Sequence, residues 1–122
     1  MVDLETIRKQ AMALPEVVEK PHFGRPAFRV RDTLFLSTHL QEEPPSVIAH
    51  VSPERAAASV AAAPDLCEEV RRTHGGRQIF VGLRIHLDPA RAGDVGLLLS
   101  ESIRGAWRHR APKRLVAQHT AT

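Results

Sequence analysis

The sequence has a single cysteine, Cys67, and no long hydrophobic run. One cysteine excludes an intrachain disulfide, and sparse cysteine is typical of proteins that work in the reducing cytoplasm. No apolar run approaches the roughly 18 residues that a membrane-spanning helix requires. Residues 1–5 have neither the basic start nor the apolar stretch of a secretory signal. We therefore expect a cytoplasmic protein, neither secreted nor membrane-spanning.

The motifs that identify many enzymes and metal proteins are also missing. The seven histidines do not lie at the close spacings of a zinc motif, and one cysteine cannot build a thiolate site. There is no Gly-x-Ser-x-Gly elbow, no phosphate-binding glycine loop and no dinucleotide fingerprint. Cys67 is followed by Glu68 and Glu69, whose charges disfavour a reactive thiolate. We expect a non-enzymatic protein with no metal and no cofactor.

What is present is the composition of an ordinary globular domain. The chain has 122 residues, of which 43% are hydrophobic and 25% charged, unlike a disordered chain. A chain of this length forms one domain that buries roughly two-thirds of its unfolded surface. We expect a single domain over residues 1–117 and a frayed tail over 118–122. A monomer is favoured.

The first half of the chain predicts one helix and several strands. Residues 4–14 carry apolar side chains at three- and four-residue spacings, which predicts an amphipathic helix with Asp3 as its N-cap and Pro15 after its end. Strands are predicted over 17–20, 27–31, 34–38 and 47–51. The second and third of these are joined at Asp32-Thr33, which indicates a hairpin.

The second half adds helices and one long strand. Ser52 and Pro53 predict the start of a helix that Pro64 ends. Residues 65–68 resemble another capped helix start, with an irregular segment before the turn at Gly75-Gly76 as the alternative. Residues 78–87 alternate strongly and predict a strand, and 94–110 predict a long final helix. This order is typical of an α+β fold, with an antiparallel sheet covered on one face by the terminal helices and open on the other.

The net charge is +3, and the basic residues are unevenly distributed. Residues 20–31 include no acidic residue, and none follows Glu101. Fourteen of the seventeen basic residues are arginine, whose planar guanidinium suits phosphate; a GC-rich genome is the alternative explanation of this bias. For the basic group over 104–114 the alternative is the helix dipole, which favours cations at a helix C-terminus by roughly 0.3–1 kcal/mol each.

The predicted open face would present several of these arginines. If the odd-numbered residues of 79–85 pack against the helices, Phe80, Arg84 and His86 are exposed together on the open face. By the same alternation Arg29 and Arg31 face outward. A sheet with arginines around an aromatic ring can hold phosphates and stack bases. The alternative is an ordinary solvated sheet face on which Phe80 is a single exposed apolar residue.

Residues 19–30, Glu-Lys-Pro-His-Phe-Gly-Arg-Pro-Ala-Phe-Arg-Val, resemble the signature of the MmcQ/YjbR family of small bacterial proteins. Three further segments match in order: residues 51–54, the strand around Phe80, and residues 106–108 leading to 111–115. The resemblance implies a frataxin-like (CyaY-like) α+β fold. Family members are commonly labelled DNA-binding.

The chain departs from this family pattern at two positions. His50 lies where the family often has lysine, which would make a phosphate contact there pH-dependent. Phe80 lies where the family often has tryptophan. Kinship with frataxins does not imply iron chemistry, because the acidic residues of the first helix are accompanied by Arg8 and Lys9.

Together these observations favour a nucleic-acid-binding domain that contacts DNA phosphates with arginines. The alternative is a module that binds a small anionic ligand or a protein partner on the open sheet face. The candidate nucleic-acid-binding residues are Arg25, Arg29, Arg31, Phe80, Arg84, Arg108, Lys113 and Arg114.

Overall fold

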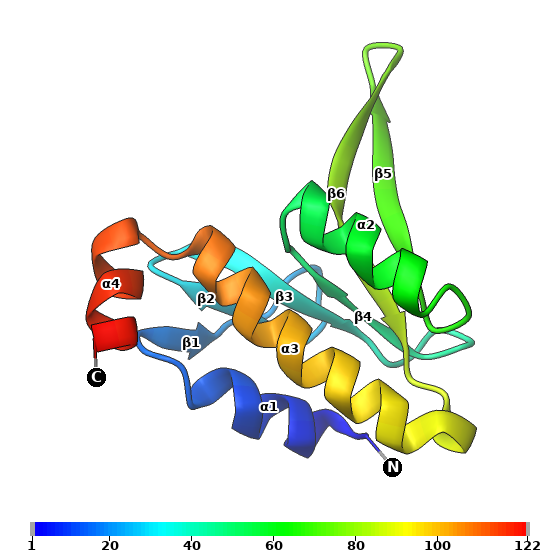
Figure 1. The fold of residues 1–122 in the computed structure, drawn as a ribbon, viewed down its shortest axis with the longest axis horizontal. Helices are drawn as coiled ribbons and strands as arrows, with labels where there is room; N and C mark the ends of the chain where they lie inside the picture. Colours follow the sequence, from blue (N-terminus) through cyan, green and yellow to red (C-terminus); the bar gives the residue numbers. More distant parts are fainter. Residues whose placement is uncertain (1, 122) are drawn as a thin grey trace.

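The computed structural model describes residues 2–121, with the side chains of residues 2–119, and has the α+β architecture expected from the sequence. Six antiparallel strands form one sheet in the order β1-β2-β3-β4-β6-β5. Helices α1, α2 and α3 cover one face of this sheet, and α4 packs at its β1–β2 end (Figure 1). The elements are α1 (Leu4–Met12), β1 (Val17–Glu19), β2 (Ala27–Val30), β3 (Thr33–His39), β4 (Ser46–Ala49), α2 (Pro53–Ala62), β5 (Cys67–His74), β6 (Arg77–His86), the 3-10 turn η1 (Pro89–Arg91), α3 (Ala92–Arg110) and α4 (Lys113–Ala121).

The helix starts are fixed by the caps that the sequence predicts. The Asp3 carboxylate accepts a hydrogen bond from the Thr6 amide at 3.0 Å, and the Ser52 hydroxyl accepts one from the Arg55 amide at 3.2 Å. Each cap satisfies an amide that has no partner within the helix. Residues 118–121, where a frayed tail is expected, form the end of α4; Leu115 of this helix is buried in the core, and the His119 ring meets Trp107 edge-on at 5.1 Å.

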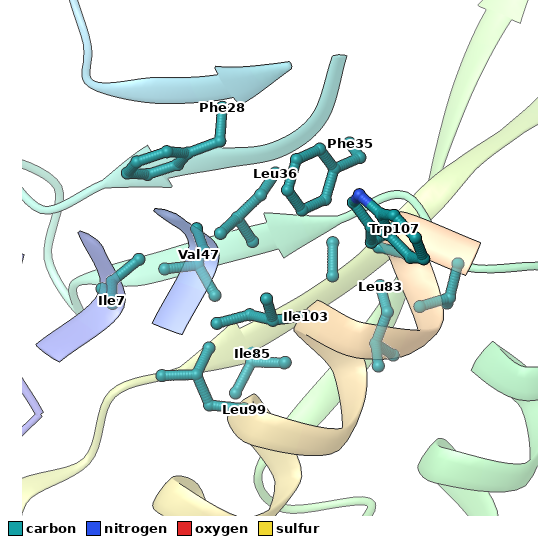
Figure 2. Packing of buried hydrophobic residues seen from close by; sticks show 14 of the residues in the cluster. Ile7, Phe28, Phe35, Leu36, Val47, Leu83, Ile85, Leu99, Ile103 and Trp107 are labelled. Atoms are coloured by element: carbon teal, nitrogen blue, oxygen red, sulfur yellow. The ribbon is translucent and has the colours of Figure 1, made fainter. Parts of the chain in front are cut away.

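The core lies between the sheet and the helices. Figure 2 shows Ile7 of α1 and three α3 side chains packed against apolar residues of the central strands. Trp107 is fully buried, and its indole Nε1 donates a hydrogen bond to the Pro15 carbonyl at 3.0 Å. This bond satisfies the indole N–H away from water and ties α3 to the connection between α1 and β1.

Residues 67–74 form strand β5, so the helix start predicted at 65–68 is wrong. β5 pairs with β6 along its whole length and joins it through Gly75-Gly76, both at positive φ (58° and 77°). Two consecutive residues with φ > 0 form the turn that suits a tight hairpin, and glycine adopts it without steric conflict. β5 shows no apolar alternation because most of its outer residues are exposed on both faces.

A bulge in the β5–β6 pairing reverses which face the side chains of β6 occupy. Val70 pairs with Gly82 and Arg71 with Phe80, so Val81 is the extra residue. Leu83 and Ile85 point into the core as predicted, but Phe80 also packs against the core, while Val81 lies on the opposite face with His50. The predicted exposure of Phe80 beside Arg84 is therefore wrong, because strict alternation does not survive a bulge.

The outer part of the β5–β6 hairpin extends beyond the rest of the sheet. β4 pairs with residues 83–86 of β6 alone, so residues 77–82 pair only with β5. The result is a two-stranded projection that stands away from the helices (Figure 1), which we call the arm and define as residues 70–80.

Gly82 lies where β6 leaves β4, and its replacement provides a test of this junction. A Cβ at Gly82 would lie 2.7 Å from the Ala49 carbonyl oxygen, a backbone atom that cannot move aside cheaply. We expect Gly82→Ala to lower the free energy of unfolding by about 1–3 kcal/mol, measured by urea denaturation. The control is Gly105→Ala in α3, where the new Cβ meets only the flexible Arg55 side chain and alanine favours the helix by about 1 kcal/mol. Equal losses in the two variants would contradict the close approach at Gly82.

Candidate functional site

The predicted site residues lie in two separate layers of the molecule. Arg25, Arg29 and Arg84 are on or beside the sheet face that no helix covers, which we call the helix-free face. Arg108, Lys113 and Arg114 are exposed on α3 and α4 in the helix layer. Arg31 is at the β2–β3 turn, and Phe80 packs against the core.

Glu42, in the β3–β4 loop, places its carboxylate near three basic side chains of the helix-free face. Its Oε2 lies 2.8 Å from His39 Nδ1 and 3.4 Å from Arg25 Nη2, and its Oε1 lies 3.9 Å from Arg84 Nη1. The hydrogen bond to His39, followed by the charges of Arg84 and Arg25, holds the pKa of Glu42 below its usual range. Arg84 also donates to the Ser46 hydroxyl at 2.8 Å. Arg25 and Arg84 are therefore partly neutralised within the protein.

The two arginines near the β2–β3 turn are also engaged. Arg31 makes a bidentate pair with Glu16, with nitrogen–oxygen distances of 2.6 and 3.0 Å, and this pairing lowers the pKa of Glu16. Arg29 donates from Nη1 to the Asp32 carbonyl at 3.3 Å. Any phosphate at Arg31 would compete with a carboxylate already held in the planar geometry that guanidinium prefers.

The arm carries basic residues that the sequence analysis did not select. Arg72 and Arg77 are exposed, and neither forms an ion pair among residues 2–121. Arg71 pairs with Glu69 at 3.0 Å and lies over the Phe80 ring, 5.9 Å from its centroid. The sequence signal was present: residues 70–87 contain four arginines and no acidic residue. The expectation of a helical or irregular segment before Gly75-Gly76 hides this signal, because the arginines come together only in a hairpin.

A cavity of about 370 Å³ opens on the helix-free face at the base of the arm. Two arginines, three histidines and one serine line it, with apolar side chains between them and no carboxylate. The lining residues are His22, Phe23, Arg25, Leu34, Ser37, His39, Ile48, His50, Arg72 and Val81. The loop over residues 20–26 thus partly covers a face that was expected to be open.

His50 is the buried ionisable group of this cavity. Its Nδ1 lies 3.1 Å from the Val81 carbonyl oxygen and 3.4 Å from Arg110 Nη2. The carbonyl is the closer neighbour and can only accept, so it favours the proton on Nδ1 and a lone pair on Nε2; the Arg110 guanidinium then faces an N–H to which it cannot donate. Burial, followed by the charge of Arg110, lowers the pKa of His50 to about 4, and His22 and Arg72 add smaller repulsions. His50 is therefore neutral at pH 7.

Three further observations concern metal binding, the cysteine and membrane insertion. Among residues 2–121 no group of three or more His, Cys, Asp or Glu side chains could hold a metal ion. Cys67 is buried, and burial, followed by the Asp65 charge, raises its pKa; the expected direction is the one found, although Glu68 and Glu69 are not its cause. No helix in the same part of the chain is long and apolar enough to cross a membrane.

The lowered pKa of His50 predicts a pH-dependent stability. Between pH 6.5 and 4 the unfolded chain binds a proton at His50 and the folded chain does not, so stability falls as the pH drops. We expect the free energy of unfolding to lose about 2 kcal/mol at this position between pH 7 and 5. In chemical denaturation, His50→Gln should lose this component, whereas His74→Gln at the exposed arm tip should keep it. An unchanged pH dependence in His50→Gln would contradict the assignment.

Comparison with known proteins shows the fold. No protein-family model matches the chain, and no match was found among curated proteins. Among solved structures, the chain is similar to Deinococcus radiodurans protein DR2400, whose domain is described as DUF419, with a TM-score of 0.66 and 20% sequence identity over 88% of this chain and 77% of that chain. The chain therefore shares the α+β fold of a DUF419 protein.

Proposed function

We propose that the protein is a non-enzymatic nucleic-acid-binding domain that contacts the phosphates of duplex DNA with its β5–β6 arm. The observation that supports this most is the unneutralised charge of the arm: Arg72 and Arg77 are exposed on a projecting hairpin without a carboxylate partner among the described residues. Such cations release counterions from DNA when they reach its phosphates, which drives association.

The shape of the arm suits a DNA groove. A two-stranded ribbon fits the major groove of B-DNA, which is roughly 12 Å wide and 8.5 Å deep. Residues 70–74 of β5 pair with residues 77–82 of β6 and with no other strand, and five strand residues span about 16 Å. The arm is thus long enough to reach the groove floor while the body of the protein stays outside.

Ion pairs within the protein make several of the residues predicted from the sequence weaker candidates for a phosphate contact. Arg25, Arg31 and Arg84 already contact Glu42, Glu16 or Glu68, so they would gain less from phosphate than unpaired cations do. The helix-layer residues Arg108 and Arg114 are exposed on α3 and α4 and do not belong to the arm. We propose that the arm makes the primary contact with DNA and that the helix-layer residues contribute little to binding.

We also propose a family and a cellular location for the protein. The resemblance of residues 19–30 to the MmcQ/YjbR signature and the DUF419 fold of a solved neighbour support membership of that bacterial family. The single cysteine supports a cytoplasmic location.

A charge-matched pair of double variants tests the arm. We expect Arg72→Gln with Arg77→Gln to weaken binding to a short DNA duplex by about tenfold, because two phosphate contacts are lost. The slope of log affinity against log salt should fall in magnitude by about 2 between roughly 50 and 200 mM salt. Fluorescence anisotropy measures both quantities.

The control, Arg108→Gln with Arg114→Gln, removes the same charge from the helix layer. It should leave the affinity within about twofold and the slope nearly unchanged. If this control weakens binding as much as the arm variant does, only net charge matters and the arm is not the binding element. If neither variant changes the salt slope, the proposed phosphate contacts are wrong.

A further inference from the structure

The cavity at the base of the arm has the charge of an anion-binding site. Arg25 and Arg72 both line it, and none of its lining residues is acidic, although Glu42 contacts Arg25 and His39 at its edge. A second hollow of the molecule has a different lining. That hollow, about 590 Å³ near the N-terminus, is lined by Glu43, Asp65 and Asp88 with mainly apolar neighbours. Of the two, only the cavity at the arm would attract an anion.

An exposed aromatic ring stands at the mouth of the same cavity. Phe23 is 86% exposed and lines the cavity. It occupies the left-handed region with φ at 52°, at the tip of a tight turn closed by two hydrogen bonds between His22 and Arg25 of 2.9 and 3.1 Å. A bulky residue at positive φ is unfavourable, and such strain concentrates at binding sites. The turn thus keeps a flat apolar surface in water next to the cations.

The polar groups inside the cavity favour a ligand that carries hydrogen-bond donors in addition to an anionic group. In the tautomer that the Val81 carbonyl favours, His50 carries its proton on Nδ1, so its Nε2 can only accept a hydrogen bond. An accepting nitrogen repels a phosphate oxygen but suits a hydroxyl or an amino group. Ser37 Oγ lies 3.2 Å from His39 Nε2, and its hydroxyl can both donate and accept. A fitting ligand therefore combines an anionic group, hydrogen-bond donors and a planar ring.

From this combination we infer that the cavity binds a mononucleotide. The ring stacks on Phe23, the phosphate lies between Arg25 and Arg72, and a sugar hydroxyl or base amino group donates to His50. The same chemistry is present in a free nucleoside monophosphate and in the phosphorylated end of a nucleic-acid strand. The site shares Arg72 with the arm, but it does not require the arm to bind a duplex.

The test is isothermal titration of the full chain with adenosine 5′-monophosphate, with adenosine and inorganic phosphate as partial ligands. We expect saturable one-to-one binding of the monophosphate and weaker binding of each part. Phe23→Asn removes the ring with a residue that tolerates the same turn, and should weaken binding at least about fivefold. Arg25→Gln should also weaken it, by less than about tenfold, because Glu42 already contacts this guanidinium.

The matched control is Arg77→Gln at the arm tip, which should leave nucleotide binding unchanged while it weakens duplex binding. Phe23→Asn should do the reverse, so failure of the cavity and failure of the arm are distinguishable. A further titration compares single strands with and without a 5′-phosphate: a preference for the phosphorylated strand assigns the site to strand ends, and equal binding assigns it to free nucleotides. Undetectable binding of the monophosphate, or binding that Phe23→Asn and Arg25→Gln leave unchanged, would overturn the inference.

Discussion

The arm and the cavity both depend on the difference in length between β6 and its neighbour β4. β6 is ten residues long and pairs with β5 throughout, but β4 reaches only its last four residues. The inner part is held in the sheet and supplies Leu83 and Ile85 to the core. The outer part has no third strand beside it and stands out as the arm (Figure 1). The bulge at Val81 lies where these two parts meet, and it brings Val81 to the cavity and Phe80 to the core.

Ion pairing occupies some arginines and leaves others available to an external phosphate. Bidentate or shared contacts with Glu16, Glu42 and Glu68 occupy several arginines of the body. Exposed ion pairs of this kind add little stability, yet they lower the attraction of those arginines for an external phosphate. Arg72 and Arg77 lack such contacts among the described residues. Unpaired charge also disfavours pairing of the free strand edges of the arm with other chains.

The sequence predicted the parts of this structure that depend on local signals. The caps at Asp3 and Ser52, the hairpin at residues 27–39 and the α+β class with one helix-covered face all follow from short patterns. β5 was missed because a strand exposed on both faces has no apolar alternation, so its only local signal was Gly75-Gly76. The bulge was missed because it depends on pairing between two strands, which no single strand reveals. The cavity joins four segments distant in the sequence, and only the fold brings them together.

The most direct test of the central claim is to map the DNA contact by amide chemical-shift perturbation in the full chain. The account predicts that a short duplex shifts the amides of residues 70–80 most, with smaller changes on the adjoining helix-free face. Shifts concentrated at residues 104–114 of α3 and α4, with the arm unaffected, would contradict it.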